Sequence, residues 1–216
     1  NISWPQLRRA LRDDFEGHEA LRQMLLNRAP KFGNDNDDVD SLAEDLLARI
    51  SREINRHANM RGTQYTVALY SIACHILLAD KVGATPDGRR RSMLLADGGV
   101  SCAQGRDKQG PTAVLKSVAK LDHQKMPGGA LLNLRFTPSI FGGRLGLENV
   151  ASMVETFFSA GGQHVQFNVV DTETLRDANE STTLANPTTL IVLVLCRAPP
   201  SSVVFAFLRQ SAVSAD

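Results

Sequence analysis

Apolar residues recur every three or four positions along two stretches near the amino terminus, which is the period of an α-helix. The first stretch covers residues 5–28 and is broken by a turn at Gly17. The second stretch places apolar side chains on one face at Val39, Leu42, Leu46, Ile50 and Ile54. We therefore predict amphipathic helices in both stretches.

The segment KFGNDNDDVD, residues 31–40, carries a dense group of acidic and amide side chains before the second helix. Ser41 followed by Glu44 is a capping-box pattern, and the aspartates would lie near the positive end of the helix. A calcium loop does not fit the spacing. A loop beginning at Asp35 would place Val39 where an oxygen ligand is needed, and a loop beginning one residue later would place a leucine at the bidentate glutamate.

The middle of the chain changes from an apolar stretch to a glycine-rich one. Residues 64–80 mix β-branched and aromatic side chains with some alternation, which predicts a buried strand running into a loop. Residues 81–111 hold six glycines between Gly83 and Gly110. A loop of this length inside a compact domain is usually functional.

Helix and strand patterns then alternate. A short helix is expected over residues 112–120, after Pro111. Strands are expected at 128–136 and 163–170, on either side of a helix over 147–158. The apolar face of that last helix contains Leu147, Val150, Val154 and Phe157. Alternating helices and apolar strands favour an α/β fold.

Composition and charge exclude several classes of function. The 216 residues are 43% apolar and 22% charged, and 24 basic residues balance 23 acidic ones, so no net field favours nucleic acid or a membrane surface. The longest aliphatic run, residues 190–195, is too short to cross a bilayer. The segment GRDKQGPT has proline where a phosphate loop needs lysine. No metal is expected, since the five histidines show no paired ligand spacing.

The three cysteines, Cys74, Cys102 and Cys196, are widely spaced and form no CxxC pair, which fits a reducing, cytoplasmic environment. The chain begins at Asn1 and has no apolar leader, so no secretory signal is indicated. This start suggests a piece of a longer polypeptide.

Five strings, in order, resemble the carboxy-terminal part of glycyl radical enzymes, the pyruvate formate-lyase superfamily. They are APKFGNDNDDVD (29–40), GATPDGRR (83–90), LADGGVSCAQGRDKQGPTAVLKSVAKLDH (95–123), GGALLNLRFTPS (128–139) and GGQHVQFNVVDTETLRDA (161–178). Within the superfamily, GPTAVLKSVAKLDH, LLNLRF and HVQFNVV are similar to the branch of glycerol and diol dehydratases, hydroxyproline dehydratase and choline lyase. Pyruvate formate-lyase activity, formate C-acetyltransferase, is the alternative.

The resemblance implies the carboxy-terminal part of a ten-stranded α/β barrel, incomplete in this chain. Residues 1–63 would form a helical segment, 64–180 the barrel strands and the glycine-radical region, and 181–216 a divergent tail. In intact relatives, an activating enzyme that uses S-adenosylmethionine and an iron–sulfur cluster installs a glycyl radical. This radical generates a thiyl radical on a cysteine, which abstracts hydrogen from a small-molecule substrate. No bound cofactor is implied, and a homodimer is a candidate assembly.

The residue that would carry the radical is missing. All sixteen glycines lie at or before Gly162, and aligning the tail with the family's radical segment places Cys196 or Val194 at the radical position. A backbone radical needs an α-carbon without a side chain, so we expect the chain to be inactive by itself. A reading-frame shift near residues 180–196, a genuinely divergent tail and a non-catalytic remnant are the interpretations left open.

The resemblance also suggests pocket or bracing roles for several other residues. Tyr70 and Ser71 are candidate substrate-pocket residues, with a core role as the alternative for the tyrosine. Neither Cys74 nor Cys102 has the sequence context of the thiyl cysteine. The candidates for bracing the glycyl loop or the barrel mouth are Asp87, Arg89, Arg106, Asp107 and Asn168.

Overall fold

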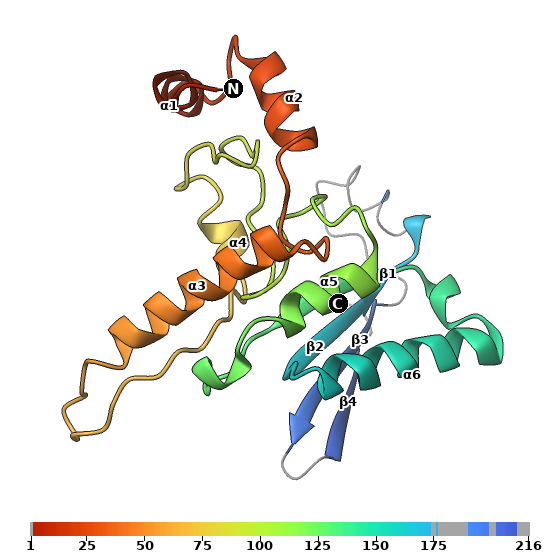
Figure 1. Cartoon of the computed structure of the whole chain (residues 1–216). Helices are drawn as coiled ribbons and strands as arrows, with labels where there is room; N and C mark the ends of the chain where they lie inside the picture. Colours follow the sequence, from red (N-terminus) through yellow and green to blue (C-terminus); the bar gives the residue numbers. More distant parts are fainter. Residues whose placement is uncertain (1, 174–175, 177–189, 199–201, 211–216) are drawn as a thin grey trace, which may run out of the picture.

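The computed structural model describes residues 2–173, 176, 190–198 and 202–210 as a mixed α/β arrangement (Figure 1). The helices are α1 (Trp4–Arg12), α2 (Glu19–Asn27), α3 (Asp37–Ile54), α4 (Cys74–Leu77), α5 (Pro111–Ala119) and α6 (Gly143–Ser159), with 3₁₀ turns η1 (His123–Lys125) and η2 (Pro138–Phe141). The strands are β1 (Leu132–Phe136), β2 (His164–Val169), β3 (Leu190–Ala198) and β4 (Ser202–Gln210). No helix among these residues is long and apolar enough to cross a membrane.

The four strands form one sheet in the order β1-β2-β3-β4. Strands β1 and β2 are parallel and are connected through α6, whereas β2–β3 and β3–β4 are antiparallel. Along β2 the side chains alternate, with Val165, Phe167 and Val169 buried and their neighbours partly exposed. This period of two is the pattern that predicted the strand, and the predicted strands at 128–136 and 163–170 are confirmed.

The main hydrophobic core lies between this sheet and the helices that cover it. Helix α6 runs across one face of the sheet (Figure 1) and packs beside α5. Val150, Val154 and Phe157 of α6 are buried, as the sequence predicted. Leu147, the fourth residue of the predicted face, is 57% exposed instead, since it lies near the start of the helix, beyond the buried part of the core.

Helices α1 and α2 form a separate, smaller unit of packing. Figure 1 shows them at the end of the molecule opposite the β3–β4 hairpin. Ser3 and Gln6 form a reciprocal capping box at the start of α1, and the chain then turns at Gly17 as the sequence predicted. The buried residues of this unit are Ala10, Phe15 and Leu25.

Helix α3 begins earlier than its sequence pattern indicated. Its cap is Asn36, whose side-chain oxygen accepts hydrogen bonds from the backbone N–H groups of Asp38 and Val39 at 3.1 and 3.4 Å. The prediction of a Ser41–Glu44 capping box is therefore wrong, because the helix is capped five residues before Ser41, where the asparagine side chain accepts hydrogen bonds from the free amides of the first turn.

The apolar stripe of α3 does not face the core. Leu42 and Leu46 are 69% and 59% exposed, whereas Asp40 and Leu47, on a neighbouring face, are buried. The carboxylate of Asp40 faces Lys120 and Ser117, and the two exposed leucines lie outside, whereas Ile54 at the end of the stripe packs against the core. The spacing of apolar residues in α3 predicts a helix correctly, but it does not identify the buried face of that helix.

The prediction of a strand over residues 64–80 is also wrong. The pairing described there consists of two isolated bridges, an antiparallel one between Gln64 and Ala58 and a parallel one between Leu69 and Ala130, where the backbone N–H of Leu69 donates to Gly129 O at 2.9 Å. The chain then turns into α4, whose residues are mostly exposed. Branched and aromatic residues favour a strand, but a strand forms only where a neighbouring strand pairs with it over several residues. Here the pairing is limited to isolated bridges.

We expect Gly162→Ala to lower the free energy of unfolding by about 1–3 kcal/mol, measured by urea denaturation. A Cβ atom at this position would overlap the ring of Phe157, which is 1% exposed and has little room to move. Gly83→Ala is the matched control, because a Cβ atom there meets no heavy atom within 4 Å. Its effect should stay below about 0.5 kcal/mol, and equal effects at the two positions would contradict this packing.

Candidate functional site

Two glycine-rich loops, residues 83–90 and 104–110, lie in the middle of the chain. The side chain of Asn34 connects the segment of residues 29–40 to the second of these loops. Its side-chain oxygen accepts hydrogen bonds from the backbone N–H groups of Lys108 and Gln109 at 2.8 and 3.1 Å. Its side-chain nitrogen donates to the carbonyls of Lys31 and Arg106 at 3.1 and 2.8 Å. A single amide therefore uses four hydrogen bonds to fix two segments more than seventy residues apart in sequence.

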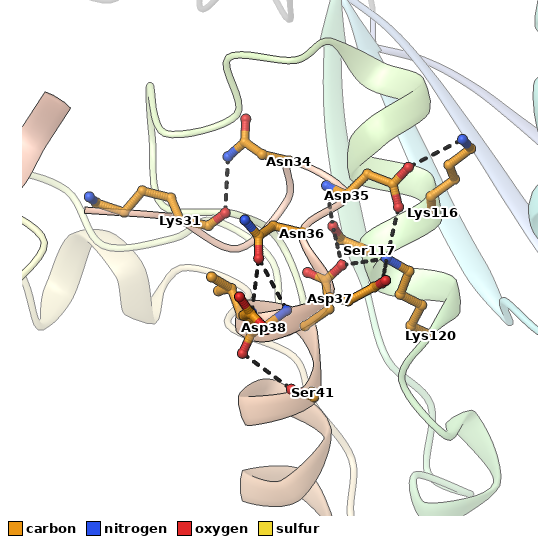
Figure 2. A network of polar contacts seen from close by, with 12 residues as sticks. Lys31, Asn34, Asp35, Asn36, Asp37, Asp38, Ser41, Lys116, Ser117 and Lys120 are labelled. Carbon is orange, nitrogen blue, oxygen red and sulfur yellow. Dashed lines mark hydrogen bonds and ion pairs between the residues drawn. The ribbon is translucent and has the colours of Figure 1, made fainter. Parts of the chain in front are cut away.

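Three aspartates of residues 31–40 surround Lys120, the residue that caps the end of α5 (Figure 2). The ammonium group of Lys120 lies 2.8 Å from Asp35, 2.7 Å from Asp37 and 2.9 Å from Asp40. Asp40 is 1% exposed and also accepts a hydrogen bond from Ser117 Oγ at 3.1 Å. Among the described residues no group of acidic, cysteine or histidine side chains could hold a metal ion. These ion pairs hold the start of α3 and the segment before it against the end of α5.

The charges in this network shift one another in the expected directions. Hydrogen bonds from Lys120 and then Lys116 hold the pKa of Asp35 below its usual value. The carboxylates of Asp35, Asp37 and Asp40 raise the pKa of Lys120 in turn. Asp35 and Lys120 therefore remain charged near neutral pH, which keeps the contact between the segment before α3 and the end of α5 intact.

Two of the predicted loop-bracing residues form an ion pair. Arg106 Nε lies 3.3 Å from Asp87 Oδ2, with both side chains mostly covered, so the pair joins the 83–90 loop to the 104–110 loop. Arg89 is 5% exposed and donates to four backbone carbonyls of its own loop, those of Val82, Gly83, Arg90 and Met93, at 2.7–3.2 Å. These contacts give the two glycine-rich loops a defined shape.

A hollow of about 460 Å³ lies between residues 97–111 and the carboxyl end of β1. Arg135 of β1 and Asp97 of the loop form an ion pair of 2.7 Å at this hollow. The backbone carbonyl of Asp97 accepts hydrogen bonds from Asn133 Nδ2 at 2.9 Å and from Ser71 Oγ at 2.6 Å. The oxygen Oδ1 of Asn133 is buried and has no hydrogen-bond partner among the residues that the structure describes.

Cys102 also lines this hollow. Its sulfur packs closely against the α-carbon of Gly33, which has a φ of +92° and where any Cβ atom would overlap Sγ. Burial, followed by the charge of Asp107 and those of Asp40 and Asp97, raises the pKa of Cys102 to about 12. The group is therefore a neutral thiol at physiological pH and a poor nucleophile.

The remaining predicted site residues lie apart from one another. Tyr70 is 44% exposed, outside the hollow, with its ring centroid 6.3 Å from that of His164. Asp107 lines the hollow, and Asn168 on β2 accepts a hydrogen bond from Gln166 at 3.0 Å. Asn168 lies in register with Arg135 of β1, so it is next to the strand that borders the hollow but does not line it.

The two candidate radical positions both lie in a regular strand. Val194 and Cys196 belong to β3, where they are in register with Gln166 and His164 of β2. The same residues are paired with β4 on the other side. The backbone at the predicted radical position therefore lies in the interior of an antiparallel sheet.

Sequence reasoning missed three polar residues at the hollow, Asp97, Asn133 and Arg135. The alternation of LNLRF carries the signal for two of them, because it places Asn133 and Arg135 on the face opposite Leu132 and Leu134. Nothing in the sequence pairs Asp97 with a residue 38 positions away.

Two family profiles match the chain. The profile described as "Pyruvate formate lyase-like" matches residues 1–79, and the one described as "Glycine radical" matches residues 96–189. The chain is 39% identical over 175 residues to trans-4-hydroxy-L-proline dehydratase from Clostridioides difficile, covering 81% of this chain and 22% of the relative. It is 37% identical over 176 residues to isethionate sulfite-lyase from Nitratidesulfovibrio vulgaris, covering 81% of this chain and 21% of that one.

A solved structure shows the same similarity in three dimensions. The B12-independent glycerol dehydratase from Clostridium butyricum, in its glycerol-bound form, superposes with a TM-score of 0.80 at 40% identity, over 88% of this chain and 24% of that one. The chain belongs to the glycyl radical enzyme family. It spans about a quarter of the length of the relatives it matches.

We expect Lys120→Met to lower the free energy of unfolding by about 3 kcal/mol, because the buried carboxylate of Asp40 loses its counter-charge. Lys116→Met is the matched control one turn earlier in α5, since Lys116 is 61% exposed and its ion pair is with Asp35. Its cost should stay below about 1 kcal/mol. Urea denaturation at neutral pH measures both, and similar losses would show that burial of Asp40 does not decide the effect.

We expect Cys102 to be alkylated at pH 8 roughly a thousandfold more slowly than a free thiol, because burial raises its pKa to about 12. Peptide mass spectrometry after timed iodoacetamide treatment measures each cysteine, with exposed Cys74 as the internal comparison. In urea the two rates should converge. Rapid labelling of Cys102 in the native protein would contradict its burial beside Gly33.

Proposed function

We propose that this chain is part of a glycyl radical enzyme that dehydrates a small polar molecule or cleaves one of its carbon–heteroatom bonds. The observation that carries the proposal is the 38–40% identity to dehydratases over most of the chain, together with the similarity to a sulfite-lyase. These relatives act on small polar substrates, as their names state. Because the chain spans about a quarter of their length, most of the substrate pocket would come from residues outside this sequence.

The proposed architecture is one part of a ten-stranded α/β barrel, in which the described sheet would contribute strands and the two glycine-rich loops would lie at an end. The Arg106–Asp87 pair and the Arg89 contacts support a bracing role for these residues. Asp107 and Asn168 would assist from the hollow and from β2, and Tyr70 and Ser71 would border the pocket. A partner enzyme that uses S-adenosylmethionine and an iron–sulfur cluster would install the radical, and a homodimer is the proposed assembly.

Within this proposal the chain does not supply the radical residue. No glycine follows Gly162 in the sequence, and an unpaired electron on the main chain is stabilised when the α-carbon is planar and carries no side chain. Val194 or Cys196 would also have to hold it within a strand paired on both sides. A non-catalytic remnant of the family is the second candidate function, and this glycine-free tail is what favours it.

Two chimeras with the Clostridioides difficile dehydratase as host test the proposal. The first replaces the matching host segment with residues 1–178 and retains the host's own sequence after it. The second carries residues 1–216 instead. After anaerobic treatment with the host's activating enzyme, we expect a glycine-centred doublet in the electron paramagnetic resonance spectrum and turnover for the first chimera only.

The two chimeras separate the parts of the proposal. A doublet from the second chimera, or from the purified 216-residue chain alone, would show that the radical does not require a glycine in the tail. Failure of the first chimera to dehydrate hydroxyproline while still forming the doublet would show that residues 1–178 support radical formation but belong to an enzyme with another substrate. Failure to form the doublet in a folded first chimera would favour the remnant.

A further inference from the structure

A second hollow, of about 670 Å³, shares no lining residue with the one beside β1, although residues 105–114 contribute to both. It is bounded by the end of α2, the segment that follows it, residues 106–109 and the first turn of α5. Its volume is in the range of small-molecule sites. We call it the basic hollow, because the charged residues that line it are Arg28, Lys31, Arg106, Lys108, Lys116 and Asp35.

Charge is concentrated in the basic hollow far beyond the average of the chain. Five cationic side chains and one carboxylate line it, whereas the whole chain has a formal net charge of +1. Lys116 pairs with Asp35 at 3.2 Å, and Arg106 pairs with Asp87 at 3.3 Å. The other three cations, Arg28, Lys31 and Lys108, are therefore the ones available to a ligand.

These three cations have no acidic partner within ion-pair distance among the described residues. The ammonium group of Lys31 donates to the backbone carbonyls of Leu25 and Ala29, both at 2.6 Å. The ammonium group of Lys108 donates to the side-chain oxygen of Asn27 at 3.2 Å. Neutral carbonyl partners orient these groups but leave their charge uncompensated, which is unusual where cations converge on a cavity.

The fold adds a further positive contribution. The first turn of α5, a helix of nine residues, lines the same hollow. Its cap residue is Gly110 and its first residue is Pro111, so no side chain accepts a hydrogen bond from the free amides of that turn. The positive end of the helix dipole adds to the three side-chain charges.

The electrostatic environment of Lys31 agrees with this geometry. Burial, followed by the charge of Arg106, lowers the pKa of Lys31, and Lys108 acts in the same direction against the opposing effect of Asp87. The ammonium group is thus held near like charges, and an anion in the hollow would relieve that repulsion.

We propose that the basic hollow binds an oxyanion group, phosphate or carboxylate, of a small molecule, with Arg28, Lys31 and Lys108 as the recognising cations. The site is separate from the hollow at β1, and the inference goes beyond the proposed radical chemistry and does not depend on it. A hollow of this size with cations at its wall suits a small anion, whereas the nearly balanced charge of the chain does not favour nucleic acid. The ligand would be fixed by charge-assisted hydrogen bonds between α2 and α5.

Isothermal titration calorimetry on the full 216-residue chain tests the site, with inorganic pyrophosphate and succinate as separate probes. We expect saturable one-to-one binding of at least one probe. The double variant Arg28→Gln/Lys108→Gln should weaken it by about tenfold or more, since two charge-assisted hydrogen bonds are removed. The preferred probe distinguishes a phosphate site from a carboxylate site.

The matched control is Arg61→Gln/Lys81→Gln, which removes the same charge from two exposed residues that do not line the hollow. It should bind within about twofold of the unmodified chain. Protection of Lys108 from acetylation by the bound probe, read by peptide mass spectrometry, gives a second measurement that identifies the place of binding. Far-UV circular dichroism establishes that each variant is folded.

Three outcomes would overturn the proposal. The first is the absence of saturable binding of either probe to the folded chain. The second is equal weakening by the control variant, which would indicate general charge attraction. The third is binding of poly-glutamate without binding of either small probe, which would indicate a surface for an acidic protein segment.

Discussion

A buried carboxylate sets the arrangement on which the rest of the described structure depends. Asp40 is 1% exposed, and its charge is matched by Lys120 at 2.9 Å. Removing such a group from water is unfavourable unless a counter-charge and hydrogen bonds replace the solvent. The need to keep this pair together fixes the position of α3 on α5, which also places Asn34 where it can hold the second glycine-rich loop.

This constraint explains which parts of the fold could be predicted from the sequence. Strand β2 and helix α6 follow local periodicity, because their apolar faces are covered by each other and by the sheet. The period of α3 was equally clear, yet the polar Asp40 rather than the aliphatic Leu42 faces inward. A hydrophobic pattern identifies a buried face only when burial of apolar area dominates, and here one paired charge outweighs it.

The candidate sites were harder to predict for a related reason. The ion pairs Arg106–Asp87 and Arg135–Asp97 and the contacts of Lys120 join residues far apart in the chain, so no local spacing reveals them. Resemblance located the loops but not their partners. The basic hollow is still less visible in the sequence, because its cations come from separate segments and the total charge is nearly balanced.

Anion binding in the basic hollow and radical formation in the tail require different features of the chain. Binding an anion needs fixed cations, and the described contacts between α2, α5 and their loops provide them within this chain. A main-chain radical needs a bare α-carbon close to a thiol, which is a property of backbone rather than of charge. Gly33 beside Cys102 shows that this chain can pack a glycine tightly against sulfur, yet it does so in a loop anchored by Asn34 and not in the tail. Side-chain recognition can therefore remain in this chain whether or not radical chemistry does.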